Sequence, residues 1–197
     1  MKKKEKIHVA IFASGGGSNA LKIIEYFKNH STIQISLIVS NKKEAGVLDI
    51  AHEHGIDALI VSKSTFYESE EILKSLDKYK ISFIVLAGFL LLVPQSIISR
   101  FNKKIVNIHP ALLPKFGGRG MYGSHVHEAV KQAGETETGI TIHFANAHYD
   151  EGDVIFQTKC ALSPEDSPSD IARKVLSLEH EYFAKTIEHL LMHCDRT

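Results

Sequence analysis

The N-terminal part of the chain reads IHVAIFASGGGSNALKIIEYFK over residues 7–28. Its first residues are apolar except for one histidine, which is typical of a short strand buried in a sheet. Three consecutive glycines follow at residues 15–17, and apolar side chains then recur at helical spacing, with Leu21, Ile24 and Phe27 on one face. The segment therefore predicts a strand, a tight loop and a helix, which is the first half of a βαβ unit.

The same alternation of apolar and amphipathic stretches continues to residue 108, which favours a mostly parallel sheet covered on both faces. Beyond it we expect two antiparallel strands and a long closing helix. The expected fold class is α/β: an open three-layer sandwich around a Rossmann-like, mostly parallel sheet with an antiparallel C-terminal portion, in a single domain over residues 1–197. The expected strands are 7–13, 33–39, 58–61, 83–87, 105–108, 138–145 and 154–161, and the expected helices are 19–28, 45–54, 66–79, 94–101, 124–132 and 168–194.

The charge of the chain is balanced, with 23 basic and 23 acidic residues and a formal net charge of zero. Such a chain gives no signal for a nucleic-acid or membrane partner, and no run approaches the ~18 apolar residues of a membrane span. The two cysteines, Cys160 and Cys194, match no metal or redox spacing. We therefore expect a cytoplasmic protein, monomeric or homodimeric, that acts on small molecules.

A phosphate-binding loop is the functional interpretation of SGGGSN at residues 14–19. Backbone N–H groups at a helix N-terminus favour an anion, and glycines let the backbone approach it closely. The loop is not a P-loop, because no Gly-Lys-Ser/Thr follows, and it matches the dinucleotide fingerprint poorly in its spacing. A phosphate monoester is the expected ligand. The alternative is an ordinary tight turn with a Ser or Asn helix cap.

The stretch Asn107-Ile108-His109-Pro110 follows an apolar strand, at the edge where ligands of open α/β sheets lie. Asn can donate a hydrogen bond to a developing oxyanion, and His can move a proton near neutral pH. A carboxylate beside His109 would raise its pKa, and Asp150, in a polar turn, is the candidate. The alternatives are a structural turn before the proline and a solvated hairpin around Asp150.

A pocket wall is expected after the fourth strand, where Gly88 bends the chain into residues 89–94, although core packing is the alternative for these apolar side chains. The Gly-rich segment 115–124 is expected to be a mobile loop. No metal site is expected, because no cysteine or carboxylate completes a familiar ligand set with the spaced histidines, which are His125, His127, His143 and His148.

With these elements in place, the chain resembles the folate-dependent formyltransferases. The Asn-X-His-Pro element is shared across that family, and the Gly-Ser-Asn loop narrows the resemblance to the glycinamide ribonucleotide branch. The resemblance covers essentially the whole chain. The residues that carry it are 14–19, 85–89, 107–115, 138–143, 150–152 and 179–180.

The resemblance implies transfer of a formyl group from 10-formyltetrahydrofolate, as a co-substrate, to the amine of glycinamide ribonucleotide in purine (IMP) synthesis, without a metal. It makes residues 1–106 the phosphate-binding half and residues 107–197 the catalytic and folate-binding half. Asn107, His109 and Asp150 are implied to be catalytic. The implied substrate-binding residues are Gly17, Ser18, Asn19 and Glu179, and the implied folate-binding residues are Leu90, Leu91, Leu92, Val93, Asn107, Asn146, Ala147, His148 and Tyr149.

The chain also departs from the family pattern. Many relatives carry Met-Arg where Leu90-Leu91 stand here, and some place an arginine near the position of Ser69. These departures leave open which residues contact the glutamate tail of the folate. Arg119 is one candidate cation for it. A methionyl-tRNA formyltransferase is expected to carry a further domain, and a formyltetrahydrofolate hydrolase an N-terminal regulatory domain. A sugar-nucleotide formyltransferase and a non-catalytic folate-binding module are also candidate functions.

Overall fold

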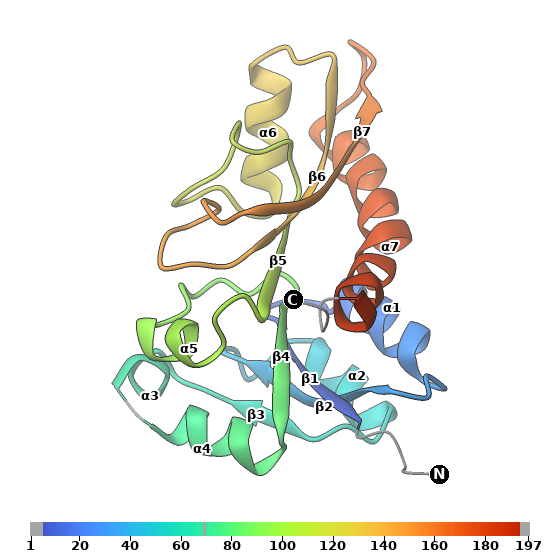
Figure 1. The fold of residues 1–197 in the computed structure, drawn as a ribbon. Helices are drawn as coiled ribbons and strands as arrows, with labels where there is room; N and C mark the ends of the chain where they lie inside the picture. Colours follow the sequence, from blue (N-terminus) through green and yellow to red (C-terminus); the bar gives the residue numbers. More distant parts are fainter. Residues whose placement is uncertain (1–5, 69, 194–197) are drawn as a thin grey trace.

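The computed structural model describes residues 6–68 and 70–193, so Ser69 and Cys194 lie outside the described residues. Neighbouring strands pair in parallel up to the fifth strand, and the last two strands pair antiparallel, as expected from the sequence (Figure 1). In spatial order the sheet is β3 (Ala58–Ile60), β2 (Ile33–Ser40), β1 (Ile7–Phe12), β4 (Ile81–Leu86), β5 (Ile105–His109), β6 (Glu137–Phe144) and β7 (Val154–Ala161).

Helices cover both faces of this sheet, which is why its central strands are apolar on both sides (Figure 1). Val9 and Ile11 of β1 pack toward one core, and Ala10 and Phe12 pack toward the other, each with 0% of its surface exposed. The first core is closed by α1 (Ser18–Phe27), α2 (Val47–Glu53), α6 (Ser124–Gln132) and α7 (Pro168–His193), and the second by α3 (Lys63–Glu68), α4 (Glu71–Lys78) and α5 (Gln95–Arg100).

Two helix predictions need correction. The single helix expected over residues 66–79 is wrong, because α3 ends at Glu68 and α4 begins at Glu71, after a turn at Glu70. In α1 the buried side chains include Ile23 rather than the expected Leu21, which is only partly buried. The rest of the element order is as predicted, and the ends of these elements lie within two residues of the expected ones.

The ends of β1, β4 and β5 place their following residues at one edge of the sheet. The strand order reverses at β1, because β2 lies on one side of it and β4 on the other. Open α/β sheets bind ligands beside such a reversal, at the carboxyl ends of the strands. Within the described part of the chain, no helix is long and apolar enough to cross a bilayer.

Candidate active site

A cavity of about 710 Å³ opens at the carboxyl ends of β1, β4 and β5. It is large enough for a drug-sized ligand or two smaller ones. Most of the residues predicted from the sequence line it. These are Asn19, Leu90, Leu91, Leu92, Val93, Asn107, His109, Asn146, His148, Tyr149, Asp150 and Glu179.

Three predicted residues, Gly17, Ser18 and Ala147, do not line this cavity. Gly17 is the N-cap of α1 at φ 81°, and a Cβ there would lie 2.8 Å from Cβ of Val47. The residue must therefore be glycine to let α1 start where it does. The alternative of a Ser or Asn cap is wrong, because α1 has no side-chain cap hydrogen bond.

Ser14 ties the glycine loop to the segment that follows β4. Its N–H donates to the carbonyl oxygen of Gly88 at 3.1 Å, and its Oγ accepts the N–H of Leu90 at 2.9 Å. The same hydroxyl donates to Oδ1 of Asn41 after β2. These contacts fix the loop and the apolar wall of the cavity relative to each other.

His109 is buried at the end of β5, with 3% of its surface exposed. Its Nε2 lies 2.8 Å from the carbonyl oxygen of Phe116, and because a carbonyl only accepts, Nε2 carries a proton. Its Nδ1 lies 3.5 Å from Oδ2 of Asp150, which also accepts the N–H of Gly118 at 2.9 Å. The structure therefore brings the predicted imidazole and carboxylate together and holds both against the Gly-rich loop.

Asn107 is held by His143, which the sequence pattern did not place in the site. The two residues are partners across β5 and β6, so their side chains share one face of the sheet. Nδ1 of His143 donates to the carbonyl oxygen of Phe144 at 2.9 Å, and its Nε2 lies 3.1 Å from Nδ2 of Asn107 and 3.6 Å from Oδ1 of Asp150. The second N–H of Asn107 makes a longer contact of 3.4 Å to Oδ1 of Asp150.

Asp150 acts on the pKa of His109 in the predicted direction, but the burial of the ring has the larger effect. Burial lowers the pKa of His109, and although Asp150 and the Phe116 carbonyl act to raise it, the net pKa lies below the ordinary value. Burial raises the pKa of Asp150, but His143, His109 and the Gly118 N–H outweigh it and the net pKa is lowered. Asp150 is thus an anion at neutral pH beside an imidazole that resists protonation.

Thr141 fixes the segment that follows His109. Its Oγ1 is buried, donates to the carbonyl oxygen of Ala111 at 2.7 Å, and accepts the N–H of Leu113 at 3.0 Å. The hydroxyl also accepts from Nε2 of Gln157 at 2.8 Å. Its donor and both of its acceptor positions are therefore used, and they anchor residues 111–113 to β6.

Asn19 and Glu179 join α1 to α7 inside the cavity. Nδ2 of Asn19 donates to Oε2 of Glu179 at 2.8 Å. Only 8% of Glu179 is exposed, and burial raises its pKa more than the bond from Asn19 lowers it. A carboxylate buried with one neutral partner has acceptor capacity left for a ligand.

Lys42 and His127 are among the lining residues that the sequence pattern did not assign to the cavity, and Arg119, the candidate cation for the folate tail, lines it too. Lys42 and Arg119 are exposed cations, whereas His127 is 8% exposed. Among the described residues, no three His, Cys, Asp or Glu side chains gather as they would around a metal ion.

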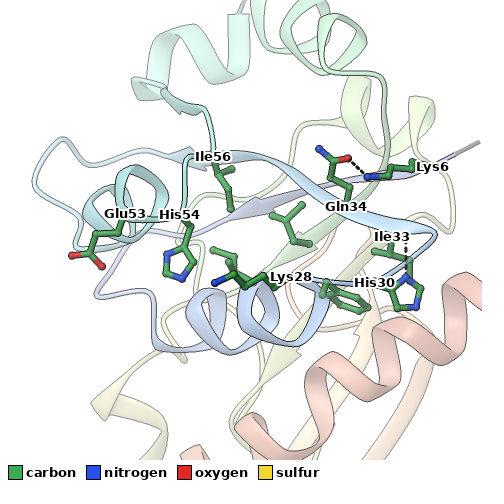
Figure 2. A pocket seen from close by; sticks show the side chains of 11 residues that line it. Lys6, Lys28, His30, Ile33, Gln34, Glu53, His54 and Ile56 are labelled. Atoms are coloured by element: carbon green, nitrogen blue, oxygen red, sulfur yellow. Dashed lines mark hydrogen bonds between the residues drawn. The ribbon is translucent and has the colours of Figure 1, made fainter.

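A second hollow of about 460 Å³ lies near the amino ends of β1 and β2, between α1 and α2 (Figure 2). Two of its polar contacts are internal to the fold. Lys6 donates to Gln34 at 3.0 Å, and Nδ1 of His30 accepts the N–H of Ile33 at 2.8 Å. All the predicted site residues lie near the opposite edge of the sheet, so the larger cavity is the candidate active site.

Known proteins are similar to this chain in sequence and in fold. The formyl transferase family matches the chain over residues 7–187. A chloroplastic phosphoribosylglycinamide formyltransferase of Arabidopsis thaliana is 40% identical over 185 residues, which cover 91% of this chain and 63% of that protein. The counterpart from Vigna unguiculata is 37% identical, with 92% and 60% covered. This chain therefore spans less than two thirds of the length of these two plant relatives.

Solved structures named phosphoribosylglycinamide formyltransferase superpose over nearly the whole chain. The one from Anaplasma phagocytophilum has a TM-score of 0.88 at 30% identity, with 96% of this chain and 88% of that chain covered. The one from Bacillus halodurans has a TM-score of 0.85 at 32% identity, with 95% and 97% covered.

Proposed function

This chain belongs to the formyl transferase family, and we propose that it moves the formyl group of 10-formyltetrahydrofolate to the amine of glycinamide ribonucleotide. The products are formylglycinamide ribonucleotide and tetrahydrofolate, in the synthesis of IMP. The observation that carries the proposal is the contact of His109 with Asp150, and of Asn107 with the same carboxylate, inside a cavity that runs from α1 to the loop after β6.

The ribonucleotide is placed at the α1 side of the cavity. Its phosphate binds the backbone N–H groups of Gly17, Ser18 and Asn19, where the helix N-terminus favours an anion and no side chain occupies the cap. Lys42, which lines the cavity next to this loop, adds a positive charge. Glu179 then accepts hydrogen bonds from the ribosyl part of the substrate.

The folate is placed on the other side, where the apolar residues 90–93 face the loop at residues 146–149. A flat heterocycle fits between aliphatic side chains and backbone groups of this kind. Arg119 also lines the cavity, and we assign it to the glutamate tail of the folate. Ala147 does not line the cavity, so its role is limited to the backbone of the loop that carries its neighbours.

The reaction begins when the amine nitrogen of the ribonucleotide attacks the formyl carbon. A C–N bond forms, and negative charge develops on the formyl oxygen. In the structure, Nε2 of His109 donates to the carbonyl oxygen of Phe116. In the reaction, the formyl oxygen, which is also a carbonyl oxygen, takes the place of the Phe116 oxygen as the acceptor. The weakly held N–H of Asn107, 3.4 Å from Asp150, is the second donor available to this oxygen.

Collapse of the tetrahedral intermediate breaks the bond between the formyl carbon and N10 of the folate. The proton lost by the attacking amine must reach N10, and Asp150 is an anion placed to relay it through water or His109. The developing oxyanion also offsets the burial that lowers the pKa of His109, so the imidazole gains a proton more readily in the transition state than before it. The chain's part is therefore electrostatic stabilisation and proton transfer, with no covalent intermediate.

The proposal makes 10-formyltetrahydrofolate a consumed co-substrate rather than a resident cofactor. It names the two small molecules as the partners and assigns the protein to the cytoplasm, a location that its low cysteine content supports. Closure of residues 115–124 over the substrates, and a monomeric or homodimeric state, remain predictions.

The test follows the absorbance change of a 10-formyl folate with purified protein, with and without glycinamide ribonucleotide. Deformylation that requires the ribonucleotide supports the transferase. Deformylation in its absence would instead identify a hydrolase. If a folded protein shows no change in either mixture, the acceptor is another amine, such as that of a sugar nucleotide, or the chain only binds folate.

A further inference from the structure

His127 is a buried polar residue that the proposed reaction does not use. It lies on α6, 8% of its surface is exposed, and its ring lines the active-site cavity. Its Nδ1 is fully buried and has no hydrogen-bond partner among the described residues. A buried polar atom without a partner is costly for the folded protein, so its presence in a binding cavity needs an explanation.

Asn19 shows the same feature on the neighbouring wall. Its Nδ2 is used by Glu179, but its Oδ1 is buried and has no partner among the described residues. α1 and α6 both pack against α7, the helix that carries Glu179, and Asn19, His127 and Glu179 all line the cavity. We call these three side chains the polar cluster.

We propose that His127 binds the glycinamide ribonucleotide by a hydrogen bond to its ribosyl or glycinamide part, and so completes the polar cluster as a specificity site. This inference rests on the proposed function. The cluster offers acceptor atoms on Asn19 and Glu179, and a neutral imidazole offers one donor and one acceptor. Hydroxyl and amide groups complement that set, whereas a phosphate or an aliphatic group does not.

Charge supports a neutral hydrogen-bonding role for this residue rather than a phosphate-binding one. Burial lowers the pKa of His127, and nearby His109 lowers it further, so the ring is uncharged at neutral pH. The phosphate is left to the loop at α1 and to Lys42. His125, two residues earlier on α6, is exposed and does not line the cavity.

The test compares His127→Leu, His127→Asn and His127→Gln with the unaltered chain. Leu keeps the apolar volume, Asn can place a polar atom near Nδ1, and Gln can place one near Nε2. The dissociation constants of glycinamide ribonucleotide and of inorganic phosphate are measured by calorimetry, and the KM of the formyl folate by turnover. His125→Leu is the control.

The expected result for His127→Leu is a loss of about tenfold in affinity for the ribonucleotide, as for one neutral hydrogen bond. Inorganic phosphate and the formyl folate should change by less than about twofold, and the melting temperature should stay equal or rise, because an unpartnered polar atom is removed. His127→Asn or His127→Gln should restore part of the affinity, and His125→Leu should behave as the unaltered chain.

Ribonucleotide binding within about twofold of the unaltered chain in His127→Leu would overturn this inference and leave the proposed function intact. An equal loss for the ribonucleotide, phosphate and folate, with a lower melting temperature, would also overturn it, because it would show a structural role. If the unaltered chain itself neither binds nor formylates the ribonucleotide, the proposed function fails, and this inference fails with it.

Discussion

Oδ2 of Asp150 lies 3.5 Å from Nδ1 of His109, but only 2.9 Å from the backbone nitrogen of Gly118. Charge-assisted hydrogen bonds are typically about 2.7–2.9 Å long, so the carboxylate is bound more closely to the loop than to the imidazole. A protonated His109 would draw it closer. The same carboxylate oxygen thus contacts both His109 and the Gly-rich loop.

Replacing Asp150 should mainly slow the chemical step. Asp150→Asn keeps the size and can still accept the Gly118 N–H, but it removes the negative charge and the proton acceptor. We expect kcat to fall by about 100-fold or more, with a much smaller change in KM. Steady-state kinetics measure this, and Glu151→Gln, in the same turn, is the control. A kcat within about threefold of the unaltered chain would remove Asp150 from the mechanism.

Two threonines of β6, Thr141 and Thr138, make a matched pair for testing the support of the segment that follows His109. Thr141→Val deletes a hydroxyl with three partners and leaves Ala111, Leu113 and Gln157 without it, so we expect a loss of about 1–3 kcal/mol in stability and a lower kcat. Thr138 is equally buried, but its Oγ1 has no partner among the described residues, so Thr138→Val should be neutral or stabilising. Urea unfolding measures both, and equal effects would contradict this account.

Glu179→Gln should stabilise the fold at pH 7 and weaken the binding of the substrate. The pKa of Glu179 is higher in the folded chain than in the unfolded chain. The stability that this group contributes is therefore fully present below the unfolded pKa of about 4.3, and it is lost as the pH rises through the folded pKa. At pH 7 the carboxylate therefore weakens the fold, and the neutral amide can keep the bond from Asn19. We expect a higher melting temperature at pH 7 and weaker binding of glycinamide ribonucleotide. A lower melting temperature at pH 7 would show that the carboxylate stabilises the fold.

Acidification should destabilise the protein through His109. Its folded pKa is lowered, so below the ordinary value of about 6.5 the unfolded chain takes up a proton that the folded chain resists. Stability therefore falls as pH drops from about 6.5 through the folded pKa, while Asp150, with its own lowered pKa, acts only at more acidic pH. His109→Gln should reduce the loss of stability between pH 7 and pH 5.5 in urea unfolding. An unchanged loss would mean that His109 titrates normally.

Of the three glycines at residues 15–17, we expect only Gly17 to be required for the start of α1. Gly17→Ala would adopt an unfavourable positive φ and bring its Cβ within 2.8 Å of Val47, so we expect a loss of about 1–3 kcal/mol. Gly16→Ala meets no atom within 4 Å and should stay within about 0.5 kcal/mol of the unaltered chain. Thermal unfolding measures the two, and an equally stable Gly17→Ala variant would contradict the backbone argument.

The sheet and the positions of Asn107 and His109 were predictable because they depend on local patterns. Apolar runs fix the strands, and the positions of Asn107 and His109 at a strand end place them at the binding edge. His143 was not predictable in the same way, because its role depends on the register of β6 with β5, and periodicity does not fix register between distant strands.

The charge state of His109 also lay beyond the sequence. The sequence suggests the carboxylate that raises its pKa, but it does not show how much protein covers the ring, and that burial has the larger effect. His127 was missed for a related reason. An isolated histidine on a helix gives no signal until the fold shows that it is buried in the cavity without a partner.

The most direct test of the proposed reaction follows the formyl carbon itself. A 10-formyl folate labelled with carbon-13 in the formyl group is incubated with the purified protein and glycinamide ribonucleotide, and the products are examined by NMR. We predict that the label appears on the glycinamide nitrogen as tetrahydrofolate forms in equal amount, and that His109→Ala slows this greatly. Label recovered as formate, or left on the folate by a folded protein, would contradict it.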